Sequence, residues 1–82
     1  MHFPSMTALR ALDSVANLGS ISEAANELNL TPSAVSHQLK ILENILGFAL
    51  TERVGRGIRI TYQGELYARD IHQLLARIFV LG

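Results

Sequence analysis

The chain has 82 residues, 49% of them apolar, which predicts one small domain with a compact core. Seven basic residues balance seven acidic ones, so the formal net charge at pH 7 is zero, and the absence of cysteine excludes disulfides, thiolate metal sites and cysteine catalysis. The amino end has no signal-peptide pattern, and the uncharged stretches are too short to span a bilayer. We therefore expect a soluble cytoplasmic protein.

The first predicted element is a helix over about residues 4–17. Its apolar residues recur at three-residue intervals and suggest one buried face: Met6, Leu9, Leu12 and Val15. Gly19 follows this run and is expected to end the helix. We interpret this helix as scaffold for the two helices that follow.

Residues 20–47 predict two capped helices joined by a tight turn. Ser20 followed by Glu23 is a capping-box pattern for the first helix, and Leu30 fills the turn. The apolar residues of this first helix are spaced for one buried face: Ala24, Ala25 and Leu28.

The second helix of the pair is predicted to run from about Pro32 to Leu46. Thr31 can accept the free amides of its first turn, and Pro32 occupies the first helical position, where no amide is needed. Gly47 can end the helix in the left-handed conformation. Two such helices around a very short turn have the layout of a DNA-binding helix-turn-helix.

The residues of this second helix sort onto two opposed faces at 3.6 residues per turn. The stripe expected to pack inward contains Val35, Leu39, Leu42 and Leu46. The far side gathers short hydrogen-bonding groups and one cation: Ser33, Ser36, His37 and Lys40. A recognition helix needs this pattern, because its first side chains read base edges while longer cationic ones reach phosphate. The alternative is an ordinary solvated face, but two serines on one helix face favour the DNA interpretation.

Residues 50–60 predict a β-hairpin with a Gly-Arg-Gly tip, in which Ile58 and Ile60 alternate with Arg59 so that one side faces the core. Arginine stands at every third residue of this segment: Arg53, Arg56 and Arg59. An arginine at such a tip is well placed to enter a minor groove or hold the DNA backbone. The alternative, favoured for Arg59 taken alone, is a surface hairpin with solubilising arginines. Beside a helix-turn-helix, we interpret the hairpin as a wing.

The zero net charge argues against nucleic acid, because DNA affinity comes largely from Lys and Arg that displace counterions. The distribution of charge answers part of this objection, since the cations of residues 31–61 cluster around the expected reading element: Lys40, Arg53, Arg56 and Arg59. The alternative function is a winged-helix module that binds protein without binding DNA.

The last predicted helix runs from about Tyr62 to Val80, with Thr61 as its candidate cap. Apolar residues follow one another in it at spacings of four, three, four and three: Tyr67, Ile71, Leu74, Ile78 and Leu81. This is a heptad seam, which either folds back on the domain or pairs with a second copy. We favour a homodimer, because the helix is apolar over a broader arc than so small a core can cover.

Catalytic and cofactor signatures are missing from the sequence. His2, His37 and His72 lie far apart without metal-ligand spacing, and there is no pair of carboxylates or activated nucleophile for catalysis. We therefore expect no metal, no cofactor and no enzymatic activity.

The motifs above resemble the amino-terminal domain of LysR-type transcriptional regulators over nearly the whole chain. The matching segments are Gly19-Ser20, Ala24-Ala25-Asn26-Glu27-Leu28, Thr31, Ala34-Val35-Ser36-His37-Gln38, Leu42-Glu43, Leu46-Gly47, Arg53, Arg56 and Thr61-Tyr62-Gln63-Gly64. The chain departs from the family pattern at Pro32, where Gln is common, at His37, where many members have Arg, and at Thr51, where Phe is usual.

The resemblance implies an all-α winged helix-turn-helix with a small β wing over residues 1–61 and a linker or dimerisation helix over 62–82. It implies binding to a double-stranded DNA operator in the bacterial cytoplasm, on the nucleoid when bound. The small-molecule effector of such regulators is expected to bind a carboxy-terminal domain outside these 82 residues. If the last helix pairs two copies, the operator is expected to be an inverted repeat.

Individual contacts can be assigned on this basis. Four residues are expected to face bases: Pro32, Ser33, Ser36 and His37. Six are expected to hold the DNA backbone or the minor groove: Thr31, Gln38, Lys40, Arg53, Arg56 and Arg59.

Overall fold

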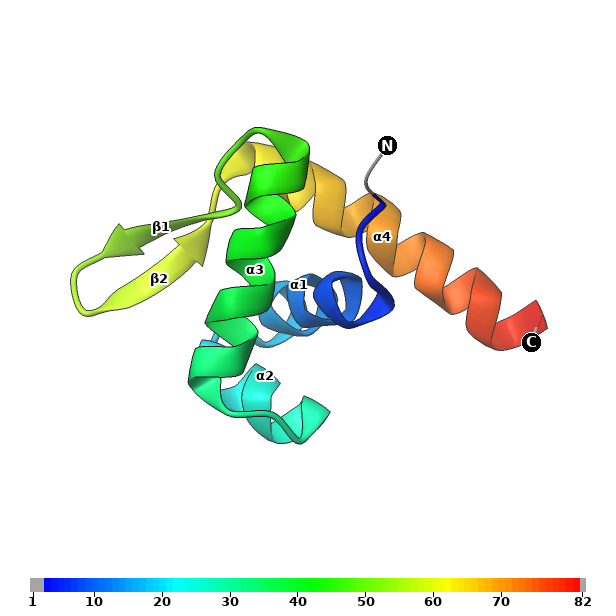
Figure 1. Cartoon of the computed structure of the whole chain (residues 1–82), viewed down its shortest axis with the longest axis horizontal. Helices are drawn as coiled ribbons and strands as arrows, with labels where there is room; N and C mark the ends of the chain where they lie inside the picture. The colour runs from blue at the N-terminus through cyan, green and yellow to red at the C-terminus, as the bar shows by residue number, and fades with distance from the viewer. Residues whose placement is uncertain (1–2, 82) are drawn as a thin grey trace.

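The computed structural model describes the backbone of residues 3–81 and the side chains of residues 3–79. Helices and one two-stranded sheet follow one another along the chain (Figure 1). Their bounds are α1 Met6–Leu18, α2 Ile21–Leu28, α3 Pro32–Leu46, β1 Thr51–Val54, β2 Gly57–Ile60 and α4 Tyr62–Leu81. This order confirms the expected winged helix-turn-helix followed by a long final helix.

Helix α1 begins two residues later than the predicted start at residue 4. The reason is Ser5, whose Oγ accepts a hydrogen bond from the N–H of Ala8 at 3.1 Å and so caps the helix. Gly19 ends the helix as predicted, with φ of 69° and its N–H bonded to the carbonyl of Val15.

The caps of α2 and α3 are those that the sequence predicts. Oγ of Ser20 accepts from the N–H of Glu23 at 3.2 Å, and Oγ1 of Thr31 accepts from the N–H of Ala34 at 3.1 Å. The turn between the helices depends on Asn29, which has φ of 57°. Asparagine tolerates this left-handed conformation better than most residues do, although Asn29 was not among the residues predicted to shape the turn.

Strands β1 and β2 pair antiparallel, with Glu52 opposite Arg59 and Arg53 opposite Ile58. Gly55 takes a positive φ of 60° at the tip, where a two-residue turn reverses the chain. Ile58 and Ile60 are half-buried while Arg59 is exposed, which confirms the predicted alternation in β2.

The core lies where α1 packs against α2 and α3. Its largest fully buried apolar side chains come from α1, α3 and the residue before β1: Leu12, Val15, Val35, Leu42 and Leu50. Leu39 is buried as well and Leu46 is half-buried, so the predicted inward stripe of α3 is confirmed. The opposite face of α3 is thereby turned outward.

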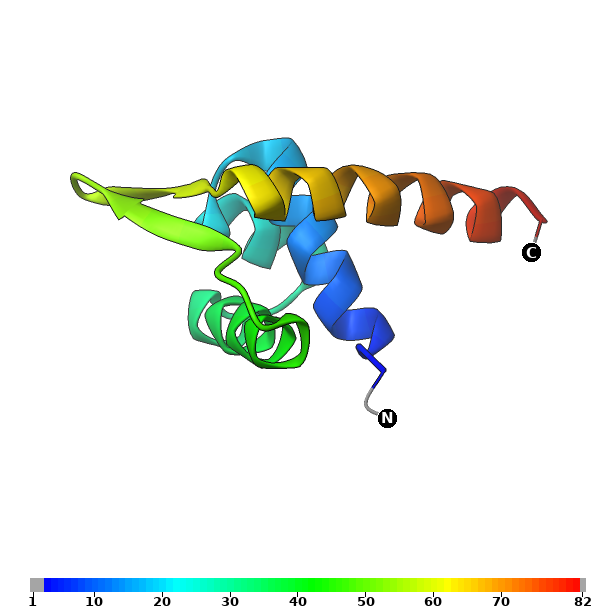
Figure 2. The ribbon, with the colours of Figure 1, turned by 90° about the horizontal axis from the view of Figure 1, so that it is seen from above.

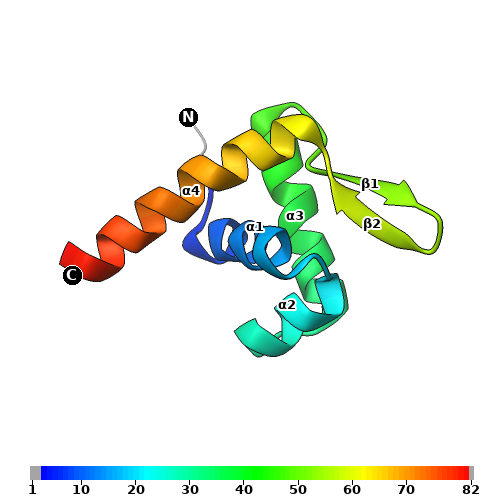
Figure 3. The ribbon, with the colours of Figure 1, turned by 180° about the vertical axis from the view of Figure 1, so that it is seen from behind.

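Helix α4 packs on α1 with its first half and then extends beyond the body of the domain (Figures 2 and 3). Ala68 and Ile71 are buried in this packing. The boundary predicted at residues 61 and 62 coincides with the start of α4, although Ala68 belongs to the same core cluster as α1 and α3. None of the described helices is long and apolar enough to cross a membrane.

Candidate nucleic-acid interface

The outward face of α3 is polar and open to solvent. Ser33, Ser36, His37 and Lys40 are all exposed, as their spacing predicts. Asn44 lies one turn beyond Lys40 and is exposed too. Extending the spacing of the polar face by four residues would have found it, so Asn44 joins the candidate interface. The face is held outward because Val35, on the opposite side of the helix, is fully buried.

The start of α3 presents Thr31 and Pro32 to solvent. Oγ1 of Thr31 is already the acceptor for the N–H of Ala34, but its hydroxyl hydrogen can still be donated to a phosphate oxygen. Gln38 differs from the other candidates, since it is half-buried and only part of its side chain can reach a ligand. Pro32 has no hydrogen-bond donor, so it can touch a base only through apolar contact.

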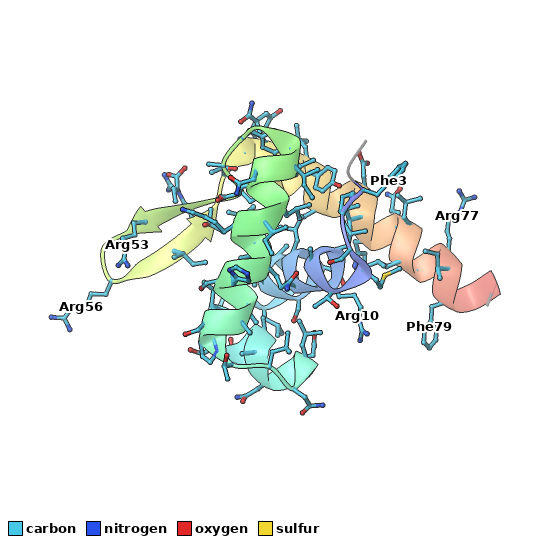
Figure 4. All side chains as sticks on the ribbon, viewed as in Figure 1. Phe3, Arg10, Arg53, Arg56, Arg77 and Phe79 are labelled. Atoms are coloured by element: carbon cyan, nitrogen blue, oxygen red, sulfur yellow. The ribbon has the colours of Figure 1, made fainter. Side chains whose placement is uncertain are left out.

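The wing arginines fall into two groups. Arg59 is bound to the carboxylate of Glu52, with 2.8 Å between Nη2 and Oε1, while Arg53 and Arg56 have no carboxylate partner within residues 3–79. Figure 4 shows Arg56 at the tip of the wing, pointing away from the body of the domain. Arg53 and Arg56 are therefore the wing cations that remain available to a ligand.

The apolar seam predicted on α4 is partly buried in the domain and partly exposed. Ile71 is only 5% exposed and Tyr67 packs half-buried against Phe48, with ring centroids 6.5 Å apart, so burial raises the pKa of Tyr67 above its ordinary value. Leu74 and Ile78 are more than half exposed, and the side chain of Leu81 lies outside the described residues. The idea of one continuous exposed seam needs correction, because Tyr67 and Ile71 are covered by the domain while Leu74 and Ile78 are exposed.

The histidines of this chain do not lie together in the part that the structure describes. No group of three or more His, Asp or Glu side chains there could hold a metal ion. His37 lies on α3, whereas Nδ1 of His72 on α4 is 2.7 Å from Oδ1 of Asp13 on α1. His2 lies outside the described residues.

A polar recognition helix beside a basic wing defines the class of winged helix-turn-helix DNA-binding domains. The model of the bacterial regulatory helix-turn-helix proteins of the lysR family matches residues 6–65 of this chain. The chain therefore belongs to the LysR family of bacterial transcriptional regulators and carries its winged helix-turn-helix.

Similar sequences support this membership. The glycine cleavage system transcriptional activator homolog of Haemophilus influenzae is 40% identical over 75 residues, which cover 92% of this chain and 25% of that protein. The transcriptional regulator TrpI of Pseudomonas aeruginosa is 51% identical over 61 residues, which cover 74% of this chain and 21% of that protein. The chain thus spans about a quarter or less of the length of these relatives.

Solved structures share the same fold. The DNA-binding domain of CbnR in complex with DNA superposes with a TM-score of 0.85 at 29% identity, covering 95% of this chain and 90% of that one. The DNA-binding domain of BenM bound to benA site 1 DNA also gives a TM-score of 0.85, at 27% identity, covering 94% of this chain and 86% of that one.

Proposed function

We propose that this domain binds a specific site on duplex DNA with the amino-terminal half of α3 in the major groove and the wing against the adjacent backbone. The observation that carries the proposal is the exposed polar face of α3 together with the wing cations Arg53 and Arg56, which have no carboxylate partner within residues 3–79. The likeness to DNA complexes of CbnR and BenM supports the same use of the fold.

The side chains at the start and on the outward face of α3 are proposed to have two roles, contact with bases and contact with the DNA backbone. Ser33, Ser36 and His37 offer hydrogen-bonding groups to base edges, and Pro32 offers apolar contact. Lys40, in the middle of α3, and the hydroxyl of Thr31, before its first turn, reach phosphate, because ammonium and hydroxyl groups donate hydrogen bonds to phosphate oxygens. Gln38 is assigned a minor share of the backbone contact, since it is half-buried.

A homodimer is proposed through the part of α4 that α1 leaves uncovered. Leu74 is 54% exposed, Ile78 is 55% exposed and Phe79 is 88% exposed, which is unusual for apolar side chains of a small monomer. Beside them, Met6, Leu28 and Leu75 contribute to an open groove of about 520 Å³ between α4, α1 and α2. Pairing two domains about a two-fold axis would make the preferred site an inverted repeat.

The relatives are much longer than this chain, and this difference bears on regulation. We propose that the domain serves a regulator whose small-molecule effector binds outside these 82 residues. Because its target is the bacterial chromosome, its place of action is the cytoplasm.

An electrophoretic mobility shift with genomic fragments, repeated at two salt concentrations, tests the proposal. We expect discrete complexes with a subset of fragments, which weaken strongly as salt is raised. A domain that shifts no fragment, but captures a protein partner, would instead be a winged-helix interaction module.

A further inference from the structure

The wing joins the rest of the domain at a small cluster of residues, which we call the wing root: Glu43, Ala49, Leu50, Thr61 and Gly64. Leu50 precedes β1 and is fully buried. Its N–H donates to Oε2 of Glu43 on α3 at 2.7 Å, and its carbonyl accepts from the N–H of Thr61 at 2.9 Å. Both backbone groups of Leu50 are therefore held, one from the recognition helix and one from the residue before α4.

Thr61 ties the same root to the start of α4. Its Oγ1 donates to the carbonyl of Ala49 at 2.7 Å and accepts from the N–H of Gly64 at 3.0 Å. The hydroxyl thus caps α4 and holds the chain segment that enters the wing. The side chain of Thr61 therefore links the orientation of α4 to the orientation of the hairpin, because it bonds to the backbone of both segments.

Gly64 allows this close approach. A Cβ atom at position 64 would lie 2.6 Å from the carbonyl oxygen of Leu50 and 2.9 Å from Oγ1 of Thr61. Distances this short require the root to move, so only glycine lets α4 start directly against the wing.

Beyond the root, the hairpin is held by Ile58 and Ile60 of β2, which pack against the core. A two-stranded ribbon is only marginally stable by itself, and in β2 Ile58 and Ile60 are no more than half-buried. Residues 52–57 are all exposed. The direction in which the wing leaves the domain is therefore set by the root together with the packing of Ile58 and Ile60.

We propose that Glu43 and Thr61 are positioning residues for DNA binding. By holding the wing root, they set where Arg53 and Arg56 lie relative to the base-facing side of α3. Neither residue has to touch DNA for this role. The proposal rests on the DNA-binding function proposed above and deepens it by naming the residues that assemble the interface.

Matched variants of Thr61 separate positioning from simple loss of bulk. Thr61→Ser keeps the hydroxyl, and Thr61→Val keeps the shape but removes both hydrogen bonds of Oγ1. Binding is measured by fluorescence anisotropy on a duplex that the parent domain selects from a random library, over a range of salt. We expect Thr61→Ser to bind like the parent and Thr61→Val to lose about tenfold in affinity with a shallower salt slope, because the wing cations no longer reach phosphate. Preference at the bases read by α3 should persist.

The decisive comparison repeats Thr61→Val in a background that carries Arg53→Ala and Arg56→Ala. If Thr61 acts through the wing, the substitution costs no further affinity there. An equal loss in both backgrounds, or equal binding by Thr61→Val and Thr61→Ser, would overturn the inference while leaving DNA binding intact. A parent domain that binds no duplex would overturn the proposed function, and the inference with it.

A second pair of variants tests Glu43 in the same way, with a control for misfolding. Glu43→Gln keeps an oxygen acceptor for the N–H of Leu50, whereas Glu43→Ala removes it. Circular dichroism melting identifies a temperature at which each variant is folded, and binding is compared there. We expect Glu43→Gln to match the parent and Glu43→Ala to reproduce the loss of affinity seen with Thr61→Val. As with Thr61→Val, this loss should disappear in the background that carries Arg53→Ala and Arg56→Ala.

Discussion

Arg59 lies directly opposite Glu52 in the wing and donates to Oε1 of that carboxylate from two nitrogens, Nε at 3.1 Å and Nη2 at 2.8 Å. Both side chains are exposed, so the pair adds little to stability. It does neutralise one of the three wing arginines and holds it on the face of the ribbon opposite Ile58. The arginines, which are equally spaced in the sequence, are therefore not equivalent in the structure.

The first prediction follows from this pairing. Arg56→Ala and Arg53→Ala should weaken binding to all duplexes similarly and lower the salt slope by about one for each protomer, whereas Arg59→Ala should change neither measurably. Glu52→Ala releases Arg59 and should strengthen binding at low salt. Anisotropy titrations over a salt series measure all four variants. Equal losses for Arg59→Ala and Arg56→Ala would show that the ion pair opens on DNA.

The second prediction concerns the salt dependence of the parent domain. A dimer that uses the exposed cations of α3 and the wing should contact roughly four to eight phosphates and release a matching number of counterions. The logarithm of the binding constant should then fall linearly and steeply with the logarithm of the salt concentration. A flat dependence would contradict DNA binding and favour the protein-interaction module.

The third prediction separates reading from anchoring on α3. Ser36→Ala and His37→Ala should each cost about 1–3 kcal/mol at particular base pairs and relax the preference there. Lys40→Ala, one turn further along the same exposed face, should weaken all sequences alike because it reaches phosphate. Selection of bound sequences from a random library, followed by sequencing, gives the preference of each variant. An unchanged preference in His37→Ala would remove His37 from the readers.

The fourth prediction uses the divided seam of α4. Leu74→Glu places a charge on the uncovered half of the helix and should break the dimer while the domain stays folded. Ile71→Glu buries a carboxylate against α1 and should cost more than about 3 kcal/mol, enough to unfold much of so small a domain. Sedimentation gives the mass of each variant, and far-ultraviolet circular dichroism gives its fold. A parent that stays monomeric at micromolar concentration would contradict the dimer.

The fifth prediction tests the close contact at Gly64 through stability. Alanine normally favours a helix over glycine by about 1 kcal/mol, but at position 64 its Cβ would meet the carbonyl of Leu50 at 2.6 Å. Gly64→Ala should therefore lower the free energy of unfolding, by about 1–3 kcal/mol. Gly57→Ala is the matched control, since its Cβ would meet nothing nearer than 3.9 Å. Urea denaturation compares the two, and a more stable Gly64→Ala would contradict the packing.

The helix-turn-helix could be predicted almost residue by residue. Thr31, Pro32 and Gly47 are local signals that act through the backbone amides and φ angles of their immediate neighbours, and α3 runs from Pro32 to Leu46 as they indicate. The start of α1 was predicted less well, because Pro4 permits a helix to begin but the hydroxyl of Ser5 decides where it does. Which face of α3 is polar also follows from spacing alone.

The sequence by itself therefore determined the helices, their caps, the alternation in β2 and the outward face of α3, since each depends on residues within a few positions of one another. Tertiary structure decided which half of the α4 seam is covered, because that depends on where α1 lies beneath it. It also decided that Glu52 neutralises Arg59 and that Glu43 and Thr61 hold Leu50. These contacts join residues seven to eleven positions apart across turns, and the geometry of those turns places the partners within hydrogen-bonding distance.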